Sequence, residues 1–158
     1  MADRLDLAVI ESRWWERSND SVRGVFEMLA GNLMDNPFGY HYEMFNNAAS
    51  IQEIIPRLAR QPDIHHIYVG AHGDDKAILG AGKQRIRWTV IQGLLEKVNA
   101  RQLYGLFFAC CGGQVERLID ESGVTWIAGY RVCRLDTLLG DGPIFLERLL
   151  SEQRAKRN

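Results

Sequence analysis

The sequence predicts an α/β fold in which a mainly parallel sheet is flanked by helices, and three observations support this. First, apolar runs at residues 66–70 and 104–108 end in small-residue turns, as buried parallel strands often do. Second, stretches with helical apolar spacing separate such runs. Third, 46% of the 158 residues are hydrophobic and 25% are charged, which is ordinary globular composition. We expect a single domain over residues 1–158.

The N-terminal part is expected to contain a strand, a helix and a second strand. Residues 5–12 form a mostly apolar run and predict the first strand. A helix should follow, capped by Asp20 or Ser21 and reaching about residue 33, because five apolar residues recur there on one helical face. After a turn at residues 36–39, residues 40–45 predict the second strand.

The middle of the chain predicts a helix, a strand, a hairpin and another helix. Residues 50–53 match a capping box for the second helix, and Pro56 falls either inside that helix or in its first turn. The third strand is expected to end at His72. Residues 74–88 lack helical spacing and predict a small surface β-hairpin. Residues 89–92 then match a second capping box, for a helix ending near residue 99.

The C-terminal part continues the same alternation. We expect a fourth strand ending at Cys110, a short helix over residues 114–122 and a fifth strand over residues 124–128. The last helix should begin at residues 141–143, with an aspartate as its cap and a proline at its first position. Repeated strand–helix units with apolar strands predict a sheet covered on both faces.

Charge and cysteine content exclude several classes of protein. The net charge is −1, so no basic surface points to nucleic acid as a partner. No apolar stretch is as long as a membrane span, and the N-terminus lacks the apolar centre of a signal peptide, so we expect no membrane partner. Three cysteines, two of them adjacent, make a poor disulfide framework and fit a reducing cytoplasm.

Two residues that follow strands suggest a catalytic site. Chemistry in open α/β sheets sits beyond the carboxyl ends of the strands, and His72 and Cys110 are expected there. An imidazole and a thiol at one sheet edge can serve as base and nucleophile, although either residue alone is more often structural. His65 and His66, at the start of a strand, are expected to face solvent or make a capping contact. The histidines and cysteines lack a metal-ligand spacing, so we expect neither a metal nor a cofactor.

The His-Gly pair after the third strand and the Ala-Cys pair after the fourth resemble the caspase-like clan of cysteine peptidases. That clan includes caspases, gingipains, separases and bacterial CHAT domains. The resemblance covers about residues 5–150 and implies the three-layer caspase/haemoglobinase-like fold. It also implies that Cys110 is the nucleophile and His72 its histidine, with the backbone N–H groups of Gly73 and Cys110 as the oxyanion hole. Cys110 fits Ala-Cys-x-Gly better than Cys111 does, and strand-like alternation should point the two side chains apart.

The resemblance also suggests substrate-binding residues. Phe108 stands where caspases have glutamine, so the clan's known side-chain preferences do not carry over. Arg13 and Arg17 follow the first strand, where caspases place an arginine of the specificity pocket. With Arg131 and Phe108, they form the candidate substrate-binding set.

The resemblance implies an intracellular cysteine endopeptidase that acts on proteins or peptides as a regulated bacterial effector of the antiviral-defence type. An activating partner or a small-molecule signal would control it, and a homodimer is left open. We expect weak activity in isolation, because loops over residues 13–19, 73–85 and 130–140 follow strands and could close the cleft. One alternative is an inactive interaction module of the same fold that binds a protein or a small signal molecule. Another is a nucleotide-binding effector domain, which the missing phosphate-binding motif disfavours.

Overall fold

The computed structural model describes residues 7–15, 20–33, 40–98, 103–109, 115–120 and 122–129. Five strands form one sheet in the order β2-β1-β3-β6-β7, and every neighbouring pair is parallel. These strands are β1 (Leu7–Ser12), β2 (Tyr40–Phe45), β3 (His66–Gly70), β6 (Gly105–Ala109) and β7 (Trp126–Gly129). The predicted α/β class and the mainly parallel sheet are therefore confirmed.

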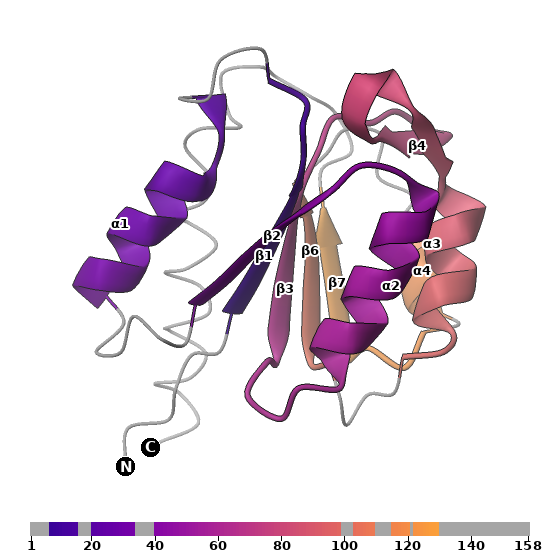
Figure 1. Cartoon of the computed structure of the whole chain (residues 1–158). Coiled ribbons are helices and arrows are strands. Elements are labelled where there is room, and N and C mark those ends of the chain that lie inside the picture. The colour runs from indigo at the N-terminus through magenta and orange to yellow at the C-terminus, as the bar shows by residue number, and fades with distance from the viewer. Residues whose placement is uncertain are drawn as a thin grey trace.

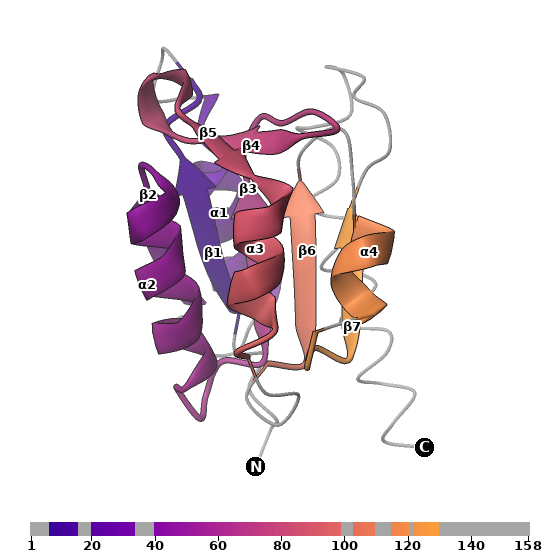
Figure 2. The same ribbon diagram turned by 90° about the vertical axis from the view of Figure 1, so that its right-hand side faces the viewer.

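Helices cover both faces of this sheet. Helix α1 (Arg23–Leu33) packs on one face, and α2 (Ala48–Ala59), α3 (Trp88–Leu95) and α4 (Val115–Asp120) lie on the other (Figures 1 and 2). Because side chains alternate along a strand, the core divides into two clusters. The cluster on the α1 side contains Leu7, Val9, Val22, Phe26, Tyr68 and Ala109. The larger cluster, on the opposite side, includes Ile10, Ile55, Ile67 and Phe108.

The starts of the first two helices depend on local side-chain caps. Helix α1 begins just after Ser21, whose Oγ accepts a hydrogen bond from the Arg23 N–H at 3.1 Å. Helix α2 is capped by Asn47, whose Oδ1 accepts from the Ser50 N–H at 3.0 Å, while the Ser50 Oγ accepts from the Asn47 N–H at 3.0 Å. The predicted capping box at residues 50–53 is therefore wrong, because Ser50 already lies inside the helix. Pro56 also lies inside α2, the first of its two predicted places.

The predicted hairpin is present and stands over the carboxyl ends of the main sheet (Figure 2). Strands β4 (Ala77–Leu79) and β5 (Arg85–Arg87) pair antiparallel and are joined by a 3-10 turn, η3 (Ala81–Lys83). Helix α3 starts directly after β5, with Arg87 at its N-cap and no side-chain capping bond. The second predicted capping box is therefore also wrong, because Thr89 is already helical.

The remaining expectations differ in detail. His66 is 6% exposed and packs against the rings of Tyr104 and Trp126, so its predicted solvent-facing or capping position is wrong, whereas His65 is exposed as expected. Strand β6 is described only as far as Ala109, and the helix predicted from residue 141 lies outside the described residues. Among the described helices, none has the length and apolar character to cross a membrane.

Candidate active site

The carboxyl ends of β1, β3 and β6 border a small hollow on the α1 side of the sheet. Gly70 of β3 lies opposite Ala109 of β6, and the Ala71 N–H donates to the Ala109 carbonyl at 3.4 Å. The lining comes from three strand ends and the start of α1: Trp14, Val22, Tyr68, Gly70, Ala71, His72 and Ala109. His72 and the residue that precedes Cys110 thus line the same hollow.

The His72 side chain is partly buried against Trp14. The two ring centroids are 4.8 Å apart and the ring planes meet at 79°, an edge-on contact. Burial lowers the pKa of His72 below its ordinary value of 6.5, because it penalises the charged imidazolium. The imidazole is therefore neutral at pH 7 and keeps a nitrogen that can accept a proton.

The backbone after β3 is held by the hairpin. The His72 carbonyl accepts the Leu79 N–H at 2.7 Å, and the Asp74 N–H donates to the Ala77 carbonyl at 2.9 Å. Gly73 lies between these two bonds, and its own N–H has no hydrogen-bond acceptor among the described residues. A fixed N–H next to the histidine is the kind of group that can stabilise a developing oxyanion.

Asp74 organises the turn that follows. Its Oδ1 accepts the N–H groups of Lys76 at 2.8 Å and Ala77 at 2.9 Å, and its carboxylate receives Arg85 at 2.8 and 2.9 Å. Its carbonyl accepts the Trp88 indole N–H at 2.9 Å. The backbone bond from Lys76, followed by Arg85, lowers the pKa of Asp74. Asp74 therefore ties the segment after Gly73 to both the hairpin and α3.

Sequence analysis missed a buried carboxylate at the end of β1. Glu11 is 0% exposed, and its oxygens accept four hydrogen bonds, from Trp14 Nε1 at 3.1 Å, Val22 N at 3.0 Å, Ser21 Oγ at 2.6 Å and Tyr42 OH at 2.7 Å. Burial is the largest cause that raises the pKa of Tyr42 to about 12, so this phenol stays a donor at neutral pH. The signal in the sequence that could have identified Glu11 is its charge within an otherwise mostly apolar strand.

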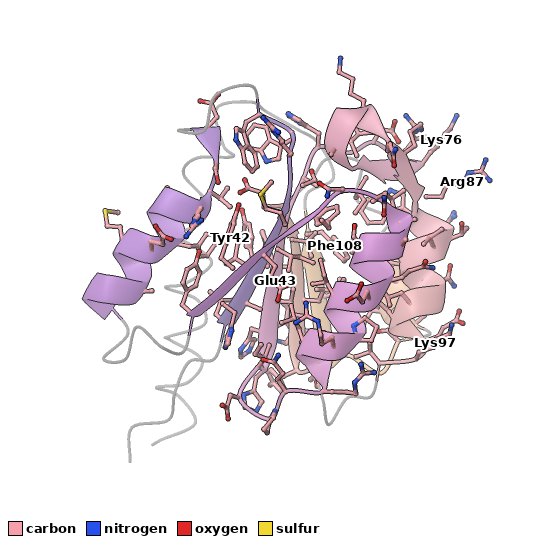
Figure 3. The ribbon with its side chains drawn as sticks, viewed as in Figure 1. Tyr42, Glu43, Lys76, Arg87, Lys97 and Phe108 are labelled. Carbon is pink, nitrogen blue, oxygen red and sulfur yellow. The ribbon has the colours of Figure 1, made fainter. Side chains whose placement is uncertain are left out.

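Phe108, predicted to contact substrate, does not reach the hollow. It is 0% exposed and stands edge-on to Trp88, with ring centroids 5.4 Å apart. Figure 3 shows it on the side of α2 and α3, across the sheet from Tyr42. The alternation along β6 accounts for this, because Ala109 faces the hollow and Phe108, the residue before it in the strand, faces away.

The other predicted site residues are placed only in part. Arg13 is exposed directly after β1 and does not line the hollow. Arg17, Arg131, Cys110 and Cys111 lie outside the described residues, as does the loop over residues 130–140. Across the described ranges, no three histidine, cysteine, aspartate or glutamate side chains gather closely enough to hold a metal ion.

The free energy of unfolding is expected to decrease as the pH falls, in part because of His72. Its pKa is lower in the folded protein than in the unfolded chain, so the unfolded chain binds the proton more readily. This contribution is present above the unfolded pKa of 6.5 and is lost as the pH falls through the folded pKa. Urea unfolding at about pH 7.5 and pH 5 should show a smaller loss for His72→Gln than for wild type. An equal or larger loss in the variant would contradict this account.

Neither a protein-family profile nor a curated protein sequence matches this chain.

Proposed function

We propose that this protein is a cysteine peptidase of caspase-like type, with Cys110 as nucleophile and His72 as base. One observation carries the proposal: His72 and Ala109 line one hollow at the ends of adjacent parallel strands, and Cys110 follows Ala109 in the sequence. A neutral imidazole and a backbone N–H without an acceptor among the described residues stand at the same place. Such a group of residues is suited to acyl transfer.

The proposed reaction has two stages. In the first, His72 takes the thiol proton, the Cys110 sulfur bonds to the substrate carbonyl carbon, and the carbonyl oxygen becomes an oxyanion facing the Gly73 N–H. The carbon–nitrogen bond then breaks, and the imidazolium gives its proton to the departing amine. In the second, His72 deprotonates a water that attacks the thioester. The carbon–sulfur bond breaks, the thiolate regains a proton, and a carboxylic acid leaves.

The substrate class follows from this chemistry. We propose a protein or peptide, since the hollow opens at the sheet edge and the nucleophile would act on an amide carbonyl. A thiol that must remain reduced fits a cytoplasmic location. We further propose that the enzyme is a regulated effector of bacterial defence, on the strength of the family resemblance alone.

The test is the pH dependence of Cys110 alkylation by iodoacetamide, read at the peptide level by mass spectrometry. In wild type the thiol should react well below the ordinary thiol pKa of about 8.5, because His72 accepts its proton. In His72→Gln the midpoint should rise toward 8.5, and the rate near pH 6.5 should fall by about tenfold or more.

The matched control is His65→Gln, at the opposite end of β3, where the exposed imidazole is outside the hollow. It should leave the alkylation profile unchanged. Identical profiles for wild type and His72→Gln would remove the peptidase proposal. The hollow would then fit the alternative, an interaction module that binds its partner without covalent chemistry.

A further inference from the structure

The buried carboxylate of Glu11 is placed where it can influence the proposed active site. Glu11 is the fifth residue of β1, and β1 lies beside β3, the strand that carries His72 at its end. Burying a charged group is costly unless it is fully hydrogen-bonded. The protein meets that cost with donors from three separate parts of the chain: the segment after β1, the start of α1, and β2.

All of the acceptor capacity of this carboxylate is used. Oε1 accepts from Trp14 Nε1 and Val22 N, and Oε2 accepts from Ser21 Oγ and Tyr42 OH. A carboxylate offers about four lone-pair sites. Glu11 is therefore saturated and cannot also accept a hydrogen bond from an imidazole. Any hydrogen-bonded or packing link from Glu11 to the histidine therefore has to pass through one of its donors.

Trp14 is the donor that connects Glu11 to the histidine. Its indole N–H is held by Glu11, its backbone N–H donates to the Ser12 carbonyl at 2.8 Å, and its ring meets the His72 imidazole edge-on at 4.8 Å. The backbone bond fixes the main chain at Trp14, and the indole bond restricts rotation of the ring about its side-chain bonds. The indole therefore offers the imidazole a fixed wall, and both rings border the hollow.

We propose that Glu11 is a positioning residue for His72 and acts through Trp14. The carboxylate fixes the indole, and the indole sets the orientation of the imidazole. The same carboxylate holds the Val22 N–H and so fixes a second wall of the hollow at the start of α1. The catalytic meaning of this arrangement rests on the proposed function, whereas the arrangement itself can be tested without it.

The test is the nuclear magnetic resonance spectrum of the His72 ring protons in the full-length protein, without substrate. The nearby indole should displace these signals by its ring current, and assignment follows from the signals lost in His72→Gln. Glu11→Met keeps the length of the side chain but removes both acceptor oxygens, so the indole N–H loses its partner and the indole should loosen. The displacement should fall by about half or more, and the pKa of His72 should move toward its ordinary value.

The matched control is Glu43→Met. Glu43 is a carboxylate on β2 that pairs with Arg57 of α2 and does not line the hollow. Its replacement should leave both the ring-proton signals and the pKa of His72 unchanged. Trp14→Phe is the second variant, because it keeps an aromatic ring but lacks the N–H that Glu11 accepts. It should loosen the His72 ring even if Glu11→Met fails to fold.

The proposal is overturned if folded Glu11→Met retains the wild-type signals and pKa of His72, or, where that variant does not fold, if Trp14→Phe shows no loosening of the His72 ring. Its failure differs from failure of the proposed function. If only the positioning is wrong, Cys110 alkylation still depends on His72. If only the peptidase chemistry is wrong, the Glu11 variant still shifts the His72 signals, but Cys110 alkylation depends on neither residue. If both are right, Glu11→Met should slow alkylation of Cys110 by about three- to tenfold, less than His72→Gln does.

Discussion

Cys110→Ala is expected to abolish all peptide cleavage and all labelling by a peptidyl acyloxymethyl ketone. The substitution removes the sulfur that would form the thioester, and alanine offers no nucleophile in its place. Labelling is measured by intact mass and by mapping of the modified peptide. Cleavage is measured on a broad set of fluorogenic peptides, with any activating partner that becomes known included.

Cys111→Ala is the matched control, since it removes the same atoms from the adjacent residue. It should keep the labelling at Cys110 and alter mainly the stability of the fold. The opposite result, with labelling only at Cys111, would contradict the assignment. Strand alternation would explain that result. Phe107 and Ala109 of β6 pack on the α1 side, and Cys111 would face the same side if the alternation continued for two more residues.

Gly80→Ala is expected to destabilise the protein by about 3 kcal/mol, the upper part of the range for overpacking. A Cβ at this position would lie 2.1 Å from the Asn46 carbonyl oxygen and 2.9 Å from its carbonyl carbon. Both are backbone atoms, so no side-chain rotation can relieve the contact. The hydrogen bond from the Ala81 N–H to the same oxygen, at 2.8 Å, would be strained as well. Urea unfolding of the variant measures the loss.

Gly93→Ala supplies the opposite case within the same protein. Gly93 lies inside α3, and a Cβ there meets nothing within 4 Å. Alanine should therefore stabilise the protein by about 0.5–1 kcal/mol through its higher helix propensity. A loss of stability in Gly93→Ala as large as in Gly80→Ala would show that the contact with Asn46 is not the cause.

The strands could be predicted because their signal is local. Strand β2 has the predicted bounds, and the hairpin of β4 and β5 occupies the stretch that lacked helical spacing. Helix starts were less predictable. A capping box forms around the non-helical residue just before the helix, and several residues near a helix start can take that place. At α2 the chain uses Asn47 as the cap and Ser50 as its partner, so the helix begins three residues earlier than the motif suggested and Ser50 is its third residue.

The residues of the candidate site also differ in whether a local sequence signal identifies them. His72 could be predicted because it follows an apolar strand directly. The role of Glu11 could not, because its donors Ser21 and Tyr42 are distant in sequence and meet it only once β1 and β2 are paired. Phe108 was misjudged because a family motif aligned the residue without showing which face of β6 it occupies.

The order of strands in the sheet has a consequence for how the chain matures. β1 pairs with β2 on one side and β3 on the other, and each later strand is added beyond β3. During synthesis the first three strands can therefore associate as a unit, while the Ala109 wall of the hollow arrives only when β6 docks. Pairing of β3 with β6 is a slow step, because the hairpin and α3 separate these two strands in the sequence. If the protein is the proposed peptidase, its nucleophile joins the histidine only after β6 has docked, and this order would protect the nascent chain and its neighbours from premature cleavage.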